Sequence, residues 1–228
     1  MPPAERRERI LVFDVNETLL DLDTLEPFFA RTFGDRRVLR RWFAELILYA
    51  EAFTLSSRYA SFTDLAVAVL EMLASIHAVS LGPNDASELV TAMRHLPPHP
   101  DARPALGMLT DAGFRMVTLT NSPPADETPL DNARLGDFFE RQFSVDTVKR
   151  YKPATPTYEL VAQGLGVELA RLRLVACHPW DTLGAAAAGC AAALVIRPGT
   201  AALGLDPRPD IVGTDLLSVA AKIIATDQ

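Results

Sequence analysis

The sequence predicts an α/β protein built on a doubly wound parallel sheet, with a helical segment inserted after the first strand. Two observations predict this fold. Short apolar runs that end in polar residues recur along the chain, and helical patterns alternate with them only after about residue 98. Such apolar runs are typical of strands buried on both faces of a parallel sheet. The alternation of strand and helix is typical of successive βα units.

The first predicted strand is the apolar run 10–13, which leads directly into Asp14. In open α/β sheets, ligands bind just beyond the carboxyl ends of the strands. Asp14 would therefore lie at the mouth of the sheet, where a carboxylate is costly to desolvate unless it has a function. The alternative is structural, because Asp14 or Asn16 could instead cap a helix that begins there.

A helical domain is predicted over residues 21–98, because apolar residues recur there at helical spacing and no strand-like run interrupts them. Gly34 ends the first helix, and Ser61 or Thr63 caps the third. Asn84 or Asp85 caps the fourth. The four helices are predicted near residues 25–33, 39–53, 62–73 and 83–96.

The predicted core domain consists of residues 1–20 and 99–228. It supplies the remaining strands and the helices between them, and Gly113 ends the first of these helices. Strands are predicted at residues 115–120, 143–145, 172–177, 192–196 and 210–212. Helices are predicted at residues 102–112, 126–135, 158–164, 181–189 and 216–226.

Composition narrows the class of protein. The 49% hydrophobic and 22% charged residues are ordinary for a soluble globular protein, and the net charge of −7 argues against a nucleic-acid partner. No apolar run reaches the roughly 20 residues that span a bilayer, and residues 1–9 lack the apolar region of a signal peptide. The two cysteines, Cys177 and Cys190, lie in apolar surroundings, which fits a reducing compartment. We expect a cytoplasmic protein that binds neither nucleic acid nor membranes.

Polar residues follow the predicted strands where a parallel sheet would bring them together. Asp14 follows the first strand, Thr120 and Asn121 end the next, Lys152 lies in a loop, and Asp181 follows the strand at 172–177. Each has a structural explanation, since Thr120 and Asn121 suit a turn, Asp181 an N-cap and Lys152 a solvated loop. Their convergence on one crevice favours catalysis.

These residues also resemble a known set of motifs. Asp14 to Leu19, Thr120-Asn121, Lys152-Pro153 and Trp180-Asp181 are similar to the four motifs of the haloacid dehalogenase superfamily. The resemblance implies a Rossmann-like core and makes the segment 21–98 a cap domain. A second set of residues resembles the type II, or (S)-2-haloacid, dehalogenases in particular: Ser144-Val145-Asp146, Tyr151 to Pro153, Tyr158 and Gly184-Ala185.

The resemblance assigns roles to the three charged residues. Asp14 would be the nucleophile, which displaces halide from a small carboxylic acid and forms an ester that water hydrolyses. Lys152 would hold the carboxylates in place. Asp181 would position or activate the water. No cofactor is implied, and the cap helices of this branch often mediate a homodimer.

Further site residues follow from the same resemblance. Thr18 and Thr120 would hydrogen-bond Asp14 or the substrate carboxylate, and Asn121 would help to line the site. Thr120 stands where the family usually has serine, which preserves the hydroxyl. Tyr158 could hydrogen-bond Lys152 and the substrate. Trp180 resembles a pocket residue, although packing alone would explain it.

The sequence departs from the family pattern in three ways, which involve four residues. Phe43 stands where the family has an arginine that receives the halide and binds substrate, and we interpret the nearby Arg40 and Arg41 as surface charges. Ala176 and His178 replace the usual serine and asparagine. His178 could supply a hydrogen bond or a titrating group near Asp181, or be a structural loop residue.

The third departure is Asn16, which stands where the superfamily's phosphatases have the aspartate that protonates the leaving alcohol. An alternative function is a Mg²⁺-dependent phosphatase with Asp14, Asn16 and Asp181 as ligands. A further alternative is a catalytically silent relative that acts as a binding protein. A halide needs no strong acid to depart, so Asn16 favours the dehalogenase.

Overall fold

The computed structural model describes residues 9–125 and 127–227, and its sheet is the predicted one. All of its strand pairings are parallel, in the order β3-β2-β1-β4-β5-β6. The chain builds outward from β1 in one direction and then crosses to β4 on its other side, which is the doubly wound, Rossmann-like arrangement. The strands are β1 (Ile10–Phe13), β2 (Met116–Thr120), β3 (Arg141–Ser144), β4 (Leu172–Ala176), β5 (Ala191–Val195) and β6 (Ile211–Gly213).

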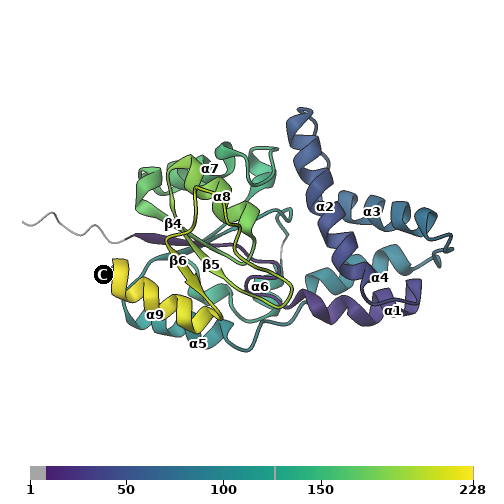
Figure 1. Cartoon of the computed structure of the whole chain (residues 1–228), viewed down its shortest axis with the longest axis horizontal. Helices are drawn as coiled ribbons and strands as arrows, with labels where there is room; N and C mark the ends of the chain where they lie inside the picture. The colour runs from purple at the N-terminus through teal and green to yellow at the C-terminus, as the bar shows by residue number, and fades with distance from the viewer. Residues whose placement is uncertain (1–8, 126, 228) are drawn as a thin grey trace, which may run out of the picture.

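Helices cover both faces of this sheet (Figure 1). On one face α5 (Ala102–Asp111) packs against α9 (Leu216–Asp227), and on the other α7 (Thr155–Leu165) packs against α8 (Pro179–Ala188). Every residue of β1 and of β4 is buried as a result. This burial fits the apolar run of β1 and the run of β4, which is apolar except for Arg173.

The helical insert, which we define as α1 to α4, lies to one side of the sheet (Figure 1). Trp42 is completely buried in it, and its indole donates a hydrogen bond to the carbonyl of Ala66 (3.0 Å). Gly34 ends the first helix in the left-handed region at a φ of 73°, and the Ser61 side chain caps the third. The bounds are α1 (Glu26–Phe33), α2 (Val38–Leu55), α3 (Phe62–Ile76) and α4 (Asp85–Arg94).

The predicted helix at 126–135 is wrong in extent. Only α6 (Pro129–Asn132) is helical, where Thr128 and Asp131 form a reciprocal capping box and Arg134 then adopts a φ of 56°. Residue 126 lies outside the described residues. Short 3₁₀ helices complete the chain: η1 (Leu22–Leu25), η2 (Gly136–Phe138), η3 (Val145–Thr147) and η4 (Leu169–Arg171).

The structure bears on the predicted absence of a membrane span, but hardly on the predicted absence of a signal peptide. Among the described residues, no helix is long and apolar enough to cross a membrane. Most of the segment that carried the signal-peptide argument, residues 1–8, lies outside the described part of the chain.

Candidate active site

Asp14 lies at the carboxyl end of the central strand β1, as predicted, and its side chain is almost completely buried. Its Oδ1 accepts a hydrogen bond from Lys152 Nζ (2.7 Å), and its Oδ2 accepts one from Thr18 Oγ1 (2.6 Å). Thr18 is fixed in turn, because its hydroxyl oxygen accepts from the amide of Cys177 (2.9 Å). No helix begins at Asp14 or Asn16 in the described chain, so the capping explanation is wrong.

Lys152 joins the two acidic groups of the site. Its ammonium lies 2.7 Å from Asp14 Oδ1, 2.7 Å from Asp181 Oδ2 and 3.1 Å from the carbonyl of Leu119. Three acceptors therefore take all three of its protons. The side chain is fully buried, so the explanation of Lys152 as a solvated charge is wrong.

Both oxygens of Asp181 are engaged. Oδ2 accepts from Lys152, and Oδ1 accepts from the Tyr158 hydroxyl (2.7 Å), which lies within 3.1 Å of the Asp181 carbonyl as well. The close approach of α8 depends on Gly184, where a Cβ would lie 2.7 Å from the Tyr158 oxygen and 2.3 Å from Pro153 Cβ. Asp181 lies in the first turn of α8, which begins at Pro179, so it is not the N-cap.

The shared ammonium separates the two carboxyls electrostatically. Burial alone would raise the pKa of Asp14, but Lys152, His178 and Thr18 together lower it below its usual value. Burial and the Asp14 charge raise the pKa of Asp181, which Lys152 only partly offsets. Burial disfavours the Lys152 ammonium, yet the two carboxylates outweigh it and raise its pKa. Asp14 is therefore the carboxyl group held ready as an anion.

Thr120, Asn121 and Asn16 surround this centre. The Asn121 side-chain oxygen accepts from the Lys152 amide (3.3 Å), which ties the end of β2 to the lysine loop. Thr120 Oγ1 accepts from the amide of Ser122 (3.1 Å), which is turn chemistry, so its contact with Asp14 or substrate stays a prediction. The Asn16 amide donates to the Ser122 hydroxyl (3.3 Å).

The two replaced positions, Phe43 and His178, contact each other. Phe43 of α2 and the imidazole of His178 have ring centroids 5.6 Å apart, and Trp180 stacks on the imidazole at 5.0 Å. His178 Nε2 lies 3.6 Å from Asp14 Oδ2 and 3.3 Å from the carbonyl of Asn16. Burial lowers the pKa of His178, although the Asp14 charge opposes this effect. His178 is thus part of the Asp14 environment.

Sequence reasoning missed Glu17. Its side chain is buried, it has a left-handed φ of 63°, and it pairs with Arg40 of α2. The Arg40 side chain is 37% exposed but also bonds Asp23 (2.6 Å), so it is an ion-paired surface residue rather than a free surface charge. Arg41 is half exposed near Glu45 (3.9 Å). The signal available was a glutamate next to Thr18, inside a stretch that is otherwise apolar or catalytic.

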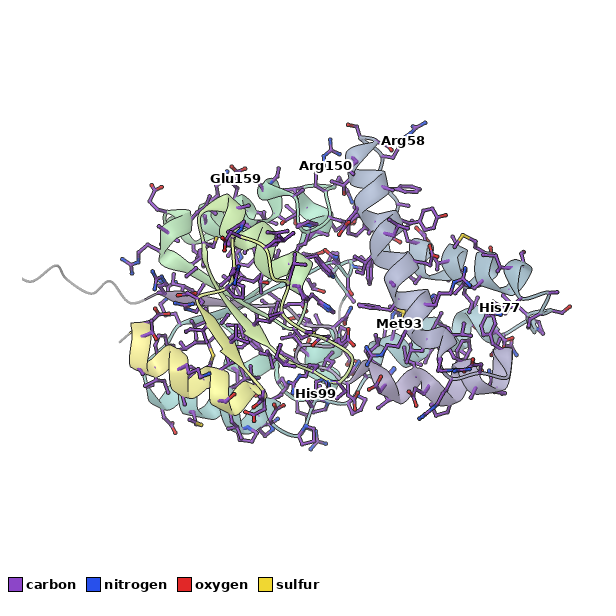
Figure 2. All side chains as sticks on the ribbon, viewed as in Figure 1. Arg58, His77, Met93, His99, Arg150 and Glu159 are labelled. Atoms are coloured by element: carbon purple, nitrogen blue, oxygen red, sulfur yellow. The ribbon has the colours of Figure 1, made fainter. Side chains whose placement is uncertain are left out.

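The loop of Glu17 is also held from the side where the insert returns to the sheet. His99 lies at this junction, and its Nε2 is 2.9 Å from the carbonyl of Glu17 (Figure 2). The left-handed conformation is uncommon, and costs free energy, at a residue other than glycine. The contacts of Glu17 with Arg40 and His99 offset this cost.

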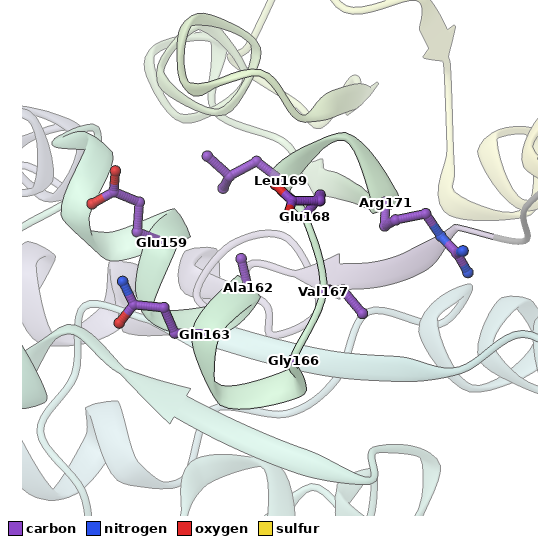
Figure 3. Close-up of a pocket in the computed structure, with 8 residues that line it drawn as sticks. All are labelled: Glu159, Ala162, Gln163, Gly166, Val167, Glu168, Leu169 and Arg171. Atoms are coloured by element: carbon purple, nitrogen blue, oxygen red, sulfur yellow. The ribbon is translucent and has the colours of Figure 1, made fainter.

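Two cavities differ in their relation to Asp14. A cavity of about 520 Å³ lies between the end of α7 and η4, lined by residues such as Glu159, Gln163 and Leu169 (Figure 3). It lies toward the amino ends of the strands, away from Asp14. A cavity of about 200 Å³ is lined by Asn16 and Thr120, which flank the catalytic centre. This smaller cavity is the candidate route for a small substrate.

Comparisons with known proteins agree with this geometry. An (S)-2-haloacid dehalogenase of Pseudomonas putida is 28% identical over 206 residues, which cover 88% of this chain and 92% of that protein. A haloacetate dehalogenase of Moraxella sp. (strain B) is 28% identical over 205 residues, 88% of this chain and 91% of the relative. The crystal structure of an L-2-haloacid dehalogenase superposes with a TM-score of 0.89 at 26% identity, covering 95% of this chain and 98% of that one.

A further solved structure carries a trapped ligand. It is the L-2-haloacid dehalogenase of Xanthobacter autotrophicus with chloropropionic acid covalently bound, and it has the same fold at a TM-score of 0.87 and 24% identity, with 96% and 99% of the two chains covered. The model of a family described as haloacid dehalogenase-like hydrolases matches residues 8–189. This match spans most of the chain, including strands β1 to β4, the insert and α8. The chain therefore belongs to the haloacid dehalogenase-like hydrolases.

Proposed function

We propose that the protein is a 2-haloacid dehalogenase that replaces the halogen of a small carboxylic acid with a hydroxyl group. The observation that carries this proposal is the buried hydrogen-bonded network of the Asp14, Lys152 and Asp181 side chains. Of its two carboxyl groups, only that of Asp14 has a lowered pKa. The named activities of the relatives support the choice of substrate class.

Asp14 acts as the nucleophile. Its carboxylate attacks the carbon that bears the halogen, the carbon–halogen bond breaks, and an ester forms between Asp14 and the substrate. Lys152 and Thr18 orient the two carboxylate oxygens through bonds of 2.7 and 2.6 Å. Fixed donors of this kind position the nucleophile without reorganisation during the reaction.

Asp181, Tyr158 and Asn121 hold the lysine in place. Tyr158 and Asp181 fix its ammonium, and Asn121 fixes the backbone amide of Lys152. The predicted role of Asp181 as an activator of water is the weaker one, since each of its oxygens already accepts a hydrogen bond of 2.7 Å within the site. We assign it the positioning of Lys152.

In this proposal the helical insert, predicted to span residues 21–98, acts as a cap domain over the site. Phe43 and Trp180 enclose His178 beside Asp14, and Asn16 and Thr120 line the adjoining cavity of about 200 Å³. A cavity of that size suits a short carboxylic acid. An apolar Phe43 provides no cation for the substrate carboxylate, so polar groups of the core must bind it.

We propose that the reaction needs no metal or other cofactor. The Lys152 ammonium already bridges the two carboxylates that a Mg²⁺ ion would use. Asn16, the third ligand of the phosphatase alternative, donates its amide to Ser122. No observation favours the phosphatase or the silent relative. A cytoplasmic location and a homodimer stay predictions.

The test is a substrate panel. The protein is incubated with chloroacetate, both enantiomers of 2-chloropropionate and a set of phosphate monoesters, each with and without EDTA. We expect halide release that EDTA does not reduce, and no phosphate release. Metal-dependent phosphate release without halide release would contradict the proposal.

A further inference from the structure

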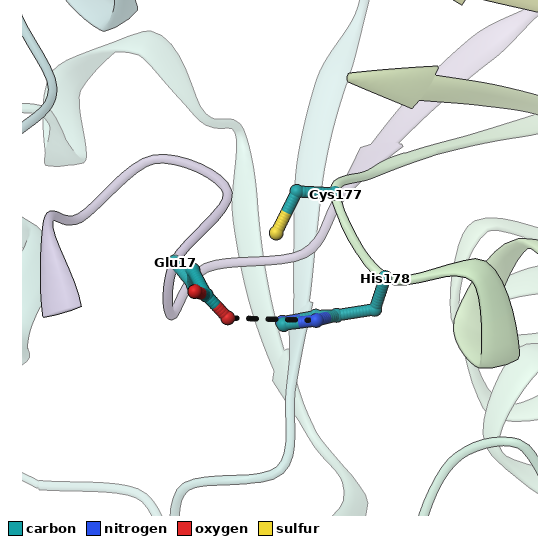
Figure 4. Close-up of side chains that lie close together, drawn as sticks. All are labelled: Glu17, Cys177 and His178. Atoms are coloured by element: carbon teal, nitrogen blue, oxygen red, sulfur yellow. Dashed lines mark ion pairs between the residues drawn. The ribbon is translucent and has the colours of Figure 1, made fainter. Parts of the chain in front are cut away.

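Both imidazole nitrogens of His178 face hydrogen-bond acceptors. Nε2 lies 3.3 Å from the Asn16 carbonyl and 3.6 Å from Asp14 Oδ2, and Nδ1 lies 3.7 Å from Glu17 Oε2 (Figure 4). The imidazole plane is held between the rings of Phe43 and Trp180. One ring nitrogen thus points to the nucleophile and the other to a buried carboxylate.

Glu17 selects the tautomer of the neutral imidazole. Its carboxylate is paired with Arg40 and is therefore an anion, and a carboxylate anion is a stronger acceptor than a carbonyl. A lone pair on Nδ1 would face that anion unfavourably. In the free protein Nε2 also faces an anion, Asp14, but this charge disappears when the ester forms, whereas the Glu17 charge remains. In the ester the proton therefore resides on Nδ1. The lone pair of Nε2 then points toward the Asp14 carboxyl group.

Asp181 is less suited to act as this base. It is completely buried, and both of its oxygens accept hydrogen bonds of 2.7 Å. These hydrogen bonds stabilise the carboxylate and so reduce its tendency to take a proton. The partners of His178 Nε2 among the described residues are acceptors, so no hydrogen bond from them stabilises its lone pair in this way.

We propose that His178 is a catalytic residue, the proton carrier that hydrolyses the Asp14 ester, and that Glu17 is its positioning residue. This inference rests on the proposed dehalogenase function. It concerns only the second half of the reaction, after the halide has left.

The proposed hydrolysis of the ester has two steps. Nε2 takes a proton from water as the water oxygen bonds to Cγ of the esterified Asp14, which gives a tetrahedral intermediate and an imidazolium. The intermediate collapses, the bond from Cγ to the substrate oxygen breaks, and the imidazolium returns its proton to that oxygen. The products are the hydroxy acid and the Asp14 carboxylic acid, which loses its proton to solvent because its pKa is low.

The charged groups around His178 favour this timing. Asp14 and Glu17 from the β1 loop and Asp181 from α8 are acidic, Lys152 is cationic, and Arg40 of α2 neutralises Glu17. The Asp14 charge, which favours the imidazolium, disappears when the ester forms. The imidazole is therefore neutral, and able to accept a proton, at the stage where a base is required.

The test uses the full-length protein with His178→Asn and His178→Gln, compared with His95→Asn as the matched control. His95 is exposed and bonds only the carbonyl of Thr91 in its own helix. Each protein is mixed with 2-chloropropionate, and halide release and the mass of the intact protein are followed over time. Thermal melts verify that the variants are folded.

We expect one equivalent of halide to be released in a burst by both His178 variants, followed by turnover at least about 100-fold slower. The ester adduct accumulates on the protein and is absent in the steady state of the control. Steady turnover at the wild-type rate without an adduct, or a folded variant that forms no adduct at all, would overturn the proposal. Absence of halide release from the wild type would instead refute the proposed function.

Glu17→Gln separates positioning from packing. The variant keeps the shape of Glu17 and removes the anion, so the pKa of His178 falls and the tautomer is no longer fixed. We expect slower ester hydrolysis whose acid limb moves to lower pH, with an unchanged halide burst. An unchanged pH profile would show that Glu17 has no role through His178.

Discussion

Two clusters in which a buried cation pairs with two carboxylates lie at opposite ends of the same sheet. At the carboxyl ends of the strands, Lys152 lies between Asp14 and Asp181 at 2.7 Å from each. At the amino ends, Arg173 lies between Asp210 (2.6 Å) and Asp227 (2.5 Å). Both cations are fully buried, so burial and charge pairing alone do not distinguish an active site from a structural clamp.

The difference lies in what remains available to a substrate. The guanidinium of Arg173 binds α9 and the loop before β6 to the sheet, and Arg9 also pairs with Asp227 (2.5 Å). Asp14, in contrast, lies beside His178 and next to the cavity lined by Asn16 and Thr120. A crevice at the carboxyl ends of the strands, rather than the ion pairs themselves, makes the first cluster reactive.

The largest expected effect is on the activity, which should depend on the Asp14 cluster and not on the Arg173 cluster. Asp14→Asn removes the nucleophile, and we expect halide release to fall by about 10⁴-fold or more while the protein stays folded. Asp227→Asn should leave the activity per folded molecule nearly unchanged, although it lowers the melting temperature. Halide release assays and thermal melts of both variants measure this contrast. Equal activity losses in the two would break the comparison.

Lys152→Met should reduce turnover by about 10²–10³-fold, because it removes the ammonium that orients Asp14. The pKa of Asp14 is lowered by Lys152 against the effect of burial, so its loss raises that pKa. Since only the carboxylate attacks, the acid limb of the halide burst should move to higher pH. Single-turnover rates measured across pH check the direction. An acid limb at the wild-type pH would show that Lys152 does not control Asp14.

Arg173→Met should act on stability instead. Removal of one partner from a buried ion cluster costs about 3–5 kcal/mol, because Asp227 keeps its charge in a buried site. Arg115→Met is the matched control, since the Arg115–Glu140 pair is half exposed and worth about 1 kcal/mol or less. Urea unfolding of the two variants measures both values. A loss of halide release in folded Arg173→Met would contradict a purely structural role.

The smallest effect is expected at Thr120. Serine keeps the hydroxyl that accepts from the Ser122 amide, so Thr120→Ser should change kcat/KM by less than about threefold, or ~0.7 kcal/mol. Thr120→Val removes the hydroxyl and should reduce kcat/KM further. Steady-state kinetics with 2-chloropropionate distinguish them, and equal values for the two variants would remove Thr120 from the site.

The sheet could be predicted because its strands have clear sequence patterns. The run at β1 is entirely apolar, the run at β4 is apolar except for Arg173, and the residues that follow each strand carry the motif side chains. The parallel topology then brings Asp14 and Asp181 to the same edge of the sheet. Lys152 bridges the gap between their carboxylates. The helix predicted at 126–135 failed for a local reason, since Pro129 starts the helix late and Arg134 ends it.

Contacts between the insert and the core could not be predicted. Nothing in the sequence joins Phe43 to His178, or Arg40 to Glu17, because each pair depends on how α2 lies over the loop after β1. The left-handed conformation of Glu17 could not be predicted either, because that conformation is expected mainly at glycine. These unpredicted contacts are the ones that place the imidazole beside Asp14.

The central claim, that Asp14 forms an ester with the substrate, is tested most directly by the origin of the product's oxygen. The protein in excess over 2-chloropropionate is allowed a single turnover in H₂¹⁸O, and both the product and the peptide that contains Asp14 are analysed by mass spectrometry. The account predicts unlabelled hydroxy acid and ¹⁸O in Asp14, because water attacks Cγ of the ester. Labelled hydroxy acid with an unlabelled Asp14 would show that water attacks the substrate directly, and would contradict the account.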